Sequence, residues 1–206
     1  ASLTVRRPGD AGIEVYGNYV SHNFFDVLGV RPSLGRFFLP EEARTELTHP
    51  VIVLSEGIWK SRLGADTSLI GREIVVNGNA FTLVGIAPAE FRGLDDPVRT
   101  DAWVPVQMQR LLRPEREVLH SASMIWMRLG GRLRDGVTAV DARRELSALA
   151  AAFEEEAIEP SWMAKYTDVR LSLLTGLPPD ATGPLAGFLG LLLGAAVIVL
   201  LIASVN

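Results

Sequence analysis

The residues of this chain that could carry out chemistry are, first, its three histidines. His22, His49 and His120 lie far apart, outside the HxxxH and HExxH spacings of helical zinc sites, and the chain has no cysteine to complete such a site. Surface or capping roles therefore explain the histidines better than a metal or catalytic role. We expect no bound metal and no cofactor.

The acidic residues gather in three short runs, Glu41-Glu42, Asp95-Asp96 and Glu154-Glu155-Glu156. Adjacent acids on a loop or at a helix end usually form solvated faces and not acid–base pairs. Ser55 stands where a helix cap is expected, and no G-x-S-x-G elbow presents a nucleophilic serine. No phosphate-binding G-x-x-x-x-G-K-[ST] loop occurs either. The sequence predicts that this chain is not an enzyme and that any ATPase lies elsewhere.

The final segment, 181–206, has no charged side chain, and 185–203 holds nineteen residues without charge or polar side chain. At about 1.5 Å per residue, a helix of that length reaches roughly 28 Å, close to the ~30 Å hydrocarbon core of a bilayer. The alternative is a buried core helix, but such a helix usually turns a polar face to water. The pattern predicts a transmembrane helix within 181–206, preceded by a water-facing domain.

Glycines recur in this segment in two G-x-x-x-G spacings, GPLAG and GLLLG. Small residues one turn apart let a second membrane helix approach closely, because packing drives helix association in lipid. Glycine is also common in membrane helices without such a role. The candidate helix-packing residues are Gly183, Gly187, Gly190 and Gly194.

The elements before the segment are predicted from periodicity and caps. IEVYGNYV reads as a first strand, and Ser21 and Gly29 bound a short helix whose buried side is Phe24, Phe25 and Leu28. The clearest signals come later in the chain. Residues 51–54 predict a strand, and a helix follows that is capped by Ser55, ends at Gly64 and carries Trp59 and Leu63 on one face. Residues 72–76 and 80–86 predict a hairpin around Asn77-Gly78.

The last third predicts a strand, a helix and a strand. Residues 124–133 and 167–175 alternate apolar and polar side chains, as strands do. Thr138 and Asp141 form a capping box before a helix that runs to about Glu156, with apolar residues at helical spacing: Ala142, Leu146, Leu149, Ala150 and Phe153. DAWVPV adds a short strand ending near Pro105, and residues 177–180 form a hinge into the membrane helix.

Composition limits the class of protein. The net charge of −4 and the pI near 5.4 give no basic field, so a nucleic-acid reader is excluded. About 180 residues remain before the apolar segment, enough for one domain or two small lobes. The element order predicts an α+β domain of two lobes. Because the chain starts with ASLTVRR, we also expect it to be part of a longer protein.

Four blocks follow one another along the sequence: VSHNFFDVLGVRPSLGRFFLPEE, PVIVLSEGIWKSRLGAD, IGREIVVNGNAFTLVGIAPAEFRG and DAWVPV. Together they resemble the MacB-like periplasmic core domain of ABC transporter permeases of the MacB/FtsX class. The following ARRELSALAAAFEEE helix and FLGLLLGAAVIVLLIASVN resemble the closing βαβ unit and the start of an FtsX-like permease domain. The motifs are structural, and they do not identify a substrate. The family's recurrent glycines fall on Gly29, Gly35, Gly71, Gly78 and Gly85, which we interpret as fold determinants.

The resemblance implies a two-lobed extracytoplasmic domain over 1–178, with Porter-like and Sabre-like subdomains and a β-rich insertion at about 36–118, followed by the membrane helix of 181–206. It also implies a place in the inner (cytoplasmic) membrane of a bacterial cell, with residues 1–178 on the extracytoplasmic side. The implied partners are an ABC ATPase subunit or domain, a second permease copy in a homodimer or pseudo-dimer, a periplasmic adaptor and membrane lipid.

Three functions follow from these observations. The first is the outer domain and membrane helix of an ABC permease, coupling the ATP-driven motion of a separate ATPase to export or to mechanotransmission. The second is a membrane-anchored binding or sensory domain without an ABC ATPase. The third, an anchored hydrolase, lacks a nucleophile, base and oxyanion donors in a recognisable arrangement. A neighbouring gene for an ATPase would favour the first function, and one for a kinase or cyclase the second.

Overall fold

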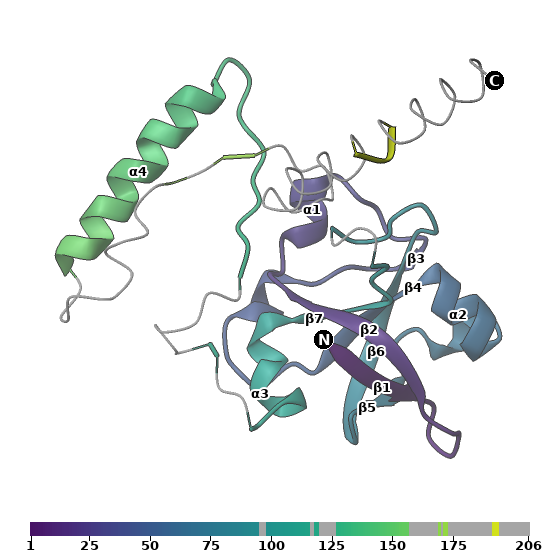
Figure 1. Ribbon diagram of the computed structural model, residues 1–206. Helices are drawn as coiled ribbons and strands as arrows, with labels where there is room; N and C mark the ends of the chain where they lie inside the picture. The colour runs from purple at the N-terminus through teal and green to yellow at the C-terminus, as the bar shows by residue number, and fades with distance from the viewer. Residues whose placement is uncertain are drawn as a thin grey trace, which may run out of the picture. The chain divides into compact units, whose positions relative to one another are not determined.

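The computed structural model describes residues 1–94, 98–115, 118–119, 127–156, 169, 171–172 and 191–193, and for 153–156 it describes the backbone only (Figure 1). The chain divides into two units. The first is Ala1–Arg92 with Arg99–Leu171, and the second is Gly93–Val98 with Ser172–Asn206. All seven described strands lie in the first unit.

Seven strands form one mixed sheet in this unit, in the order β3-β6-β4-β7-β2-β1-β5, and β5 also pairs with β6. The sheet therefore closes on itself as a barrel of six strands, and β3 pairs with the second half of β6, on the edge whose first half pairs with β5 (Figure 1). The strands are β1 (Ser2–Arg6), β2 (Ile13–Val20), β3 (Leu34–Gly35), β4 (Val51–Ser55), β5 (Glu73–Val76), β6 (Asn79–Ala87) and β7 (Ala102–Pro105).

Closure depends on β6, the longest strand. Its first half pairs antiparallel with β5, and its second half pairs parallel with β4 and antiparallel with β3. The β4–β6 register shifts at Val84, which has no partner on β4. Such a bulge adds one residue and reverses the alternation beyond it. As a result Leu83 and Ile86 both face the barrel interior, while Val84 faces outward.

The barrel interior is a continuous apolar core. Strand residues that alternate inward fill it, and Trp59 and Leu63 of α2 (Glu56–Leu63) pack against it. The largest side chains with no exposed surface inside it include Ile52, Leu54, Ile74, Phe81, Leu83, Ile86 and Met108. Burial of a leucine or phenylalanine side chain is worth about 1.5–3 kcal/mol, so this core dominates the stability of the unit.

A second apolar cluster covers the outer face of β4, β6 and β7. It holds Phe25 of α1 (Phe24–Leu28), Phe38 and Trp103, all buried. The Phe25 ring stacks on Phe37 with centroids 3.7 Å apart and meets Trp103 edge to face at 5.6 Å. The helix α1 is thereby fixed to the outside of the barrel by Phe25, and Phe24 packs against the same cluster.

Most of the local signals in the sequence are confirmed. Ser55 ends β4 and accepts a hydrogen bond from the Ile58 N–H as the cap of α2, and Gly64 closes that helix with φ +68°. Asn77 and Gly78 both have positive φ in the turn between β5 and β6, as a type I′ hairpin requires. Gly29 closes α1 with φ +71°.

The start of α1 differs from the prediction. The cap position is held by Asn23 and not by Ser21, and no side chain caps the helix. The Ser21 hydroxyl donates instead to Asn23 Oδ1 at 2.8 Å. Of the predicted buried side, Phe25 is fully buried, whereas Phe24 and Leu28 are half-buried, because a helix of five residues turns only one side chain straight into the sheet.

Two glycines allow β3 and the residue after it to lie against β6. A Cβ on Gly85 would stand 2.1 Å from the Arg36 carbonyl oxygen, and one on Gly35, whose φ is +69°, would stand 2.3 Å from the Val84 oxygen. Real Cβ atoms do not approach backbone so closely. Both glycines therefore act as fold determinants, as the sequence predicts.

The remaining short elements close the barrel and its loops. They are the 3₁₀ helices η1 (Pro40–Ala43), η2 (Thr67–Leu69) and η3 (Val106–Met108), and the helix α3 (Gln109–Leu112). Met108 and Leu112 enter the interior core. Asn77 and Asn79 of the hairpin donate to the carbonyl oxygens of Leu112 and Leu111, which ties α3 to the end of β6.

The last helix of the unit is α4 (Ala139–Glu156), with the predicted capping box. The Asp141 N–H donates to Thr138 Oγ1 at 3.2 Å, and the Thr138 N–H donates to Asp141 Oδ2 at 3.4 Å. The strands predicted on either side of it are wrong where they can be checked. Residues 127–133, and 169, 171 and 172, are not in strands, because alternation alone forms no strand without a neighbour to pair with.

Several predictions fall outside the described residues. Residues 124–126 of a predicted strand, the hinge at 177–180 and the segment 181–206 lie there, except for residues 191–193, which are helical. None of the described helices is both long and apolar enough to cross a bilayer. The predicted domain limits also stay predictions. The strands β1 and β2 precede residue 36 yet pair with β5 and β7, so both sides of that limit contribute to one sheet.

Candidate interaction surface

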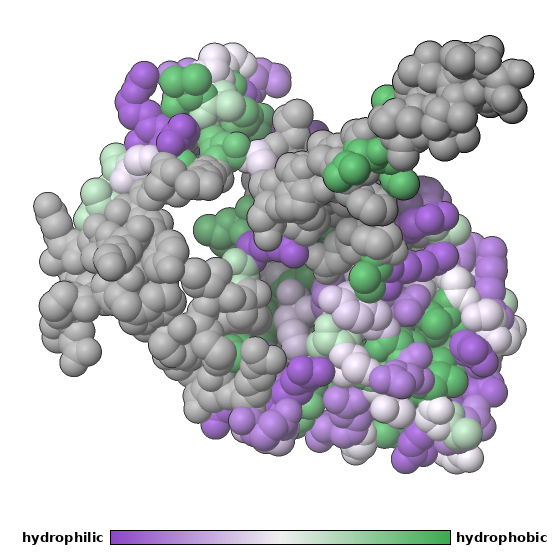
Figure 2. Space-filling model, viewed as in Figure 1, coloured by the Kyte–Doolittle hydropathy of each residue, from purple (hydrophilic) through white to green (hydrophobic). Residues whose placement is uncertain are grey.

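Residues 127–156, which we call the arm, carry an unusual number of exposed apolar side chains. Leu129 is 93% exposed and Val140 68%. The other exposed apolar residues of the arm are Met127, Leu133, Val137, Leu146 and Leu149. Figure 2 shows hydrophobic and hydrophilic residues side by side on this part of the surface, at the upper left.

The apolar face of α4 is the most regular part of this surface. Leu146 and Leu149 lie on one side of the helix with Ala142 and Ala150, as their spacing predicts. Both alanines are half-buried, but Leu146 is 41% and Leu149 50% exposed. Leaving half of a leucine in water forgoes about 1 kcal/mol of burial free energy. Within the part of α4 whose side chains are described, no residue joins either buried cluster.

Charge is unevenly distributed along the arm. Residues 127–144 hold five arginines and two aspartates, whereas 145–156 hold four glutamates and no base. Arg144 Nη1 lies 3.4 Å from Asp141 Oδ1, an exposed pair of the kind that adds little stability. The arm therefore offers an apolar face with a basic beginning and an acidic end, which is the chemistry of a protein contact.

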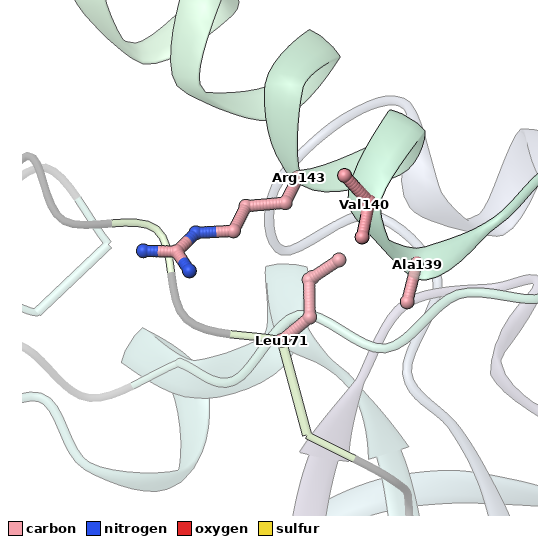
Figure 3. A pocket seen from close by; sticks show the side chains of 4 residues that line it. All are labelled: Ala139, Val140, Arg143 and Leu171. Carbon is pink, nitrogen blue, oxygen red and sulfur yellow. The ribbon is translucent and has the colours of Figure 1, made fainter.

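A shallow hollow of about 380 Å³ opens at the beginning of α4. Ala139, Val140 and Arg143 line it from the helix, and Leu171 lines it from the segment that follows (Figure 3). The Arg143 guanidinium points away from the other three side chains (Figure 3). The described lining therefore consists of three apolar side chains and one arginine.

Arg132 links the arm to the outer helix of the barrel. Its Nε and Nη2 donate to the Val27 carbonyl oxygen in the last turn of α1, at 3.3 and 3.1 Å. The contact joins residues 105 positions apart in the sequence. The sequence does not reveal this contact, because nothing in it distinguishes Arg132 from Arg134, two positions later.

Two of the three histidines lie in the described part of the chain. His22 is half-buried on the way into α1, His49 is exposed with its Nδ1 2.8 Å from the Thr48 hydroxyl, and His120 lies outside the described residues. Across the described residues, no group of three His, Asp or Glu side chains is close enough to hold a metal ion. Ser55 is the cap of α2, as predicted.

The acidic pair Glu41-Glu42 has a structural use that the sequence did not reveal. Glu42 is buried, and its two carboxylate oxygens accept from Arg36 Nη2 at 2.6 Å and Nη1 at 3.0 Å, while Oε2 also accepts from the Leu39 N–H at 2.8 Å. The hydrogen bond to Glu42 raises the pKa of the Arg36 guanidinium, although burial acts in the opposite direction. This pair holds the loop after β3.

Asp95-Asp96 and the side chains of Glu154-Glu155-Glu156 lie outside the description, as do the candidate packing residues. The packing of Gly183, Gly187, Gly190 and Gly194 against another helix therefore stays a prediction.

Tyr19 Oη and Trp103 Nε1 are among the buried side-chain atoms that have no hydrogen-bond partner within the described structure. Burial raises the pKa of the Tyr19 phenol, with Arg113 lowering it and Glu115 raising it to smaller extents. The Trp103 ring lies in an entirely apolar cluster, 5.4 Å from Phe91.

Comparison with known families and solved structures gives one matching family and several similar structures. Residues 1–149 match the model of the family described as MacB-like periplasmic core domain. Comparison with curated proteins gives no match. The fold is similar to that of the periplasmic region of MacB from Actinobacillus actinomycetemcomitans, with a TM-score of 0.53 and 16% identity over 75% of this chain and 64% of that one.

The extracellular domain of the noncanonic ABC-type transporter YknZ from Gram-positive bacteria also matches, with a TM-score of 0.42 and 17% identity over 54% of this chain and 53% of that one. The chain thus spans less than two thirds of the length of either structure. Identities this low concern the fold and not the function.

Proposed function

The chain belongs to the family of MacB-like periplasmic core domains, and from that premise we propose that it couples the ATP-driven motion of a separate ATPase to export or mechanotransmission. It does so as the extracytoplasmic domain and adjoining membrane helix of an ABC transporter permease. The observation that carries the proposal is the family match over residues 1–149. The MacB periplasmic region supports the same fold.

The proposal places residues 1–178 outside the cytoplasmic membrane of a bacterial cell, with 181–206 crossing the bilayer. The partners are an ABC ATPase, which supplies the energy, and a second permease copy, which completes the membrane assembly. A periplasmic adaptor is a further partner. None of these requires catalytic chemistry from this chain, in keeping with side chains that cap, pair and pack.

In this function the barrel and the arm have different tasks. The barrel is closed by strand pairing around one core, so it moves as a body when it is pulled. The arm exposes leucines that stay half in water, so it gains free energy when another surface covers them. We assign the arm to contacts with the rest of the permease assembly.

The test is to loosen the hinge at 177–180 in the assembled permease. Insertion of six residues from a Gly-Ser linker there should uncouple ATP hydrolysis from transport, because a flexible linker transmits little force. A matched control inserts the same linker at the tip of the exposed β1–β2 loop, beside Gly9. Transport per ATP should fall with the hinge insertion and stay unchanged with the loop insertion. Unchanged transport with both insertions would contradict the proposal.

A further inference from the structure

The end of α1 offers an acceptor that its own helix does not satisfy. The last carbonyl groups of a helix lack intrahelical partners, and α1 has no basic residue in its last turn. The N–H groups that follow bond to other oxygens, Gly29 to Asp26 and Val30 to Phe25. The Val27 oxygen takes its hydrogen bonds from Arg132 of the arm instead.

The geometry around this contact leaves room for the guanidinium. A Cβ on Gly29 would stand 3.3 Å from Arg132 Nη2, which is tighter than ordinary contacts. Gly29 also needs its positive φ to end the helix. The same glycine therefore closes α1 and keeps the approach of Arg132 open.

The helix that Arg132 holds is firmly attached to the barrel. Phe25 is fully buried and stacks on Phe37, and it also contacts Phe91 and Trp103. A displacement of α1 must disturb this aromatic cluster, which lies on the outer face of β4, β6 and β7. The cluster makes α1 a rigid attachment point.

From these contacts we propose that Arg132 is the positioning residue that holds the arm in register with the barrel, by its two hydrogen bonds to the Val27 carbonyl. The bonds are charge-assisted but exposed to solvent. These hydrogen bonds can therefore break and re-form at a small cost in free energy. This suits a contact between barrel and arm that opens and closes as the assembly moves. The use of this contact in transmitting motion rests on the proposed function, whereas the contact itself does not.

The first experiment measures the register directly on the 206-residue chain in detergent micelles. The chain has no cysteine, so Ser61→Cys on α2 and Ala148→Cys on α4, both at exposed positions, take spin labels without competition. Double electron–electron resonance then gives the distribution of distances between barrel and arm. Arg132→Gln should widen this distribution roughly twofold, because the arm samples more orientations once the contact is lost.

Two further variants separate positioning from general stability. Arg132→Lys keeps one cationic donor and should restore part of the narrow distribution. Arg134→Gln removes the same charge two positions away, at an exposed site, and should leave the distribution unchanged. Equal distributions for Arg132→Gln and Arg134→Gln would overturn the proposal. So would a lower melting temperature for Arg132→Gln without any widening, since this is the mark of a merely structural role.

The second experiment uses the assembled permease with its ATPase. Arg132→Gln should lower transport per ATP severalfold, while Arg134→Gln should not. If the labels separate in Arg132→Gln but transport per ATP is unchanged, the positioning role stands and its part in the proposed function is refuted. If transport falls and the labels do not respond, the positioning role is refuted and the proposed function remains.

Discussion

The barrel and the arm treat their apolar residues in opposite ways. The barrel encloses Phe81, Leu83 and Ile86 with no exposed surface, whereas the arm leaves Leu146 and Leu149 about half exposed. Leu146 and Leu149 are predicted from the sequence as part of one helix face, whereas Ile86 faces inward with Phe81 and Leu83 only because of the bulge at Val84. The difference is that the barrel strands find one another, while the described surroundings of α4 supply no matching face. The barrel thus buries its own apolar residues, and the exposed leucines of the arm are the observation behind its proposed role in assembly contacts.

The largest expected effect is on the barrel core. Phe81→Ala removes a ring with no exposed surface and leaves a cavity, so the free energy of unfolding should fall by about 3–5 kcal/mol. Urea denaturation followed by circular dichroism measures it. A loss below about 1 kcal/mol would mean that the barrel core contributes no more to stability than the arm does.

Two glycines, one in the barrel and one in the arm, test how tightly each region is packed. Gly85→Ala should cost on the order of 3 kcal/mol, because its Cβ would meet the Arg36 backbone at 2.1 Å and backbone cannot move aside. Gly131→Ala in the arm has no atom within 4 Å of its Cβ and should be neutral, or stabilising by about 0.5 kcal/mol. The melting temperatures of the two variants should therefore differ clearly, and equal values would contradict the close approach of β3 to β6.

The buried carboxylate of the barrel should matter more than its exposed neighbour. Glu42→Gln removes the charge that pairs with Arg36 and should cost about 1–2 kcal/mol, while Glu41→Gln at the adjacent exposed position should cost almost nothing. The cost stays modest because the Arg36 side chain is 43% exposed and water solvates the charge left behind. Thermal unfolding of both variants provides the measurement, and equal losses would show that the pair is not specific.

A smaller effect is expected from Tyr19. Tyr19→Phe removes a buried hydroxyl without a partner, so it should be neutral or stabilise the barrel by about 1 kcal/mol. The raised pKa adds a pH dependence. The folded state holds the phenol proton more tightly than the unfolded chain, so the stability from Tyr19 is complete below the ordinary pKa of 10.0 and is lost as pH rises through the folded-state pKa. In Tyr19→Phe, denaturation at alkaline pH should no longer show this loss of stability with rising pH. An unchanged slope of stability against pH would refute the assignment of that loss to Tyr19.

The smallest effect on stability is expected in the arm. Leu149→Ala on α4 should change the free energy of unfolding by no more than about 0.5 kcal/mol, because the side chain is already half in water. It should nevertheless weaken assembly of the permease, which co-purification with the partner subunits would detect. A loss comparable to that of Phe81→Ala would remove the distinction between the two regions.

Local structure could be predicted because it is determined within a few residues. The Ser55 cap, the Asn77-Gly78 turn, the Gly29 helix end and the Thr138–Asp141 capping box are each set by sterics or hydrogen bonds within four positions. The family resemblance is likewise confirmed, by the match over 1–149.

The rest depends on partners distant in sequence. Strand β1 was not predicted, and barrel closure rests on β5 pairing with both β1 and β6, which no local pattern encodes. The strand predicted over 124–133 is wrong for residues 127–133, because they alternate without a pairing partner. Arg132 and Val27 meet across 105 positions, and Arg36 selects Glu42 and not Glu41 only once the loop is folded.

The ring of six strands has a further consequence for how other molecules recognise this domain. Each of the six strands has a neighbour on both sides over part of its length, so the described barrel has no free edge strand beyond the two residues of β3. Addition of an extended peptide to a sheet edge, which needs such a strand, is therefore disfavoured. Neighbouring proteins then contact mainly the outward-facing side chains, and edge-to-edge association between copies is disfavoured as well.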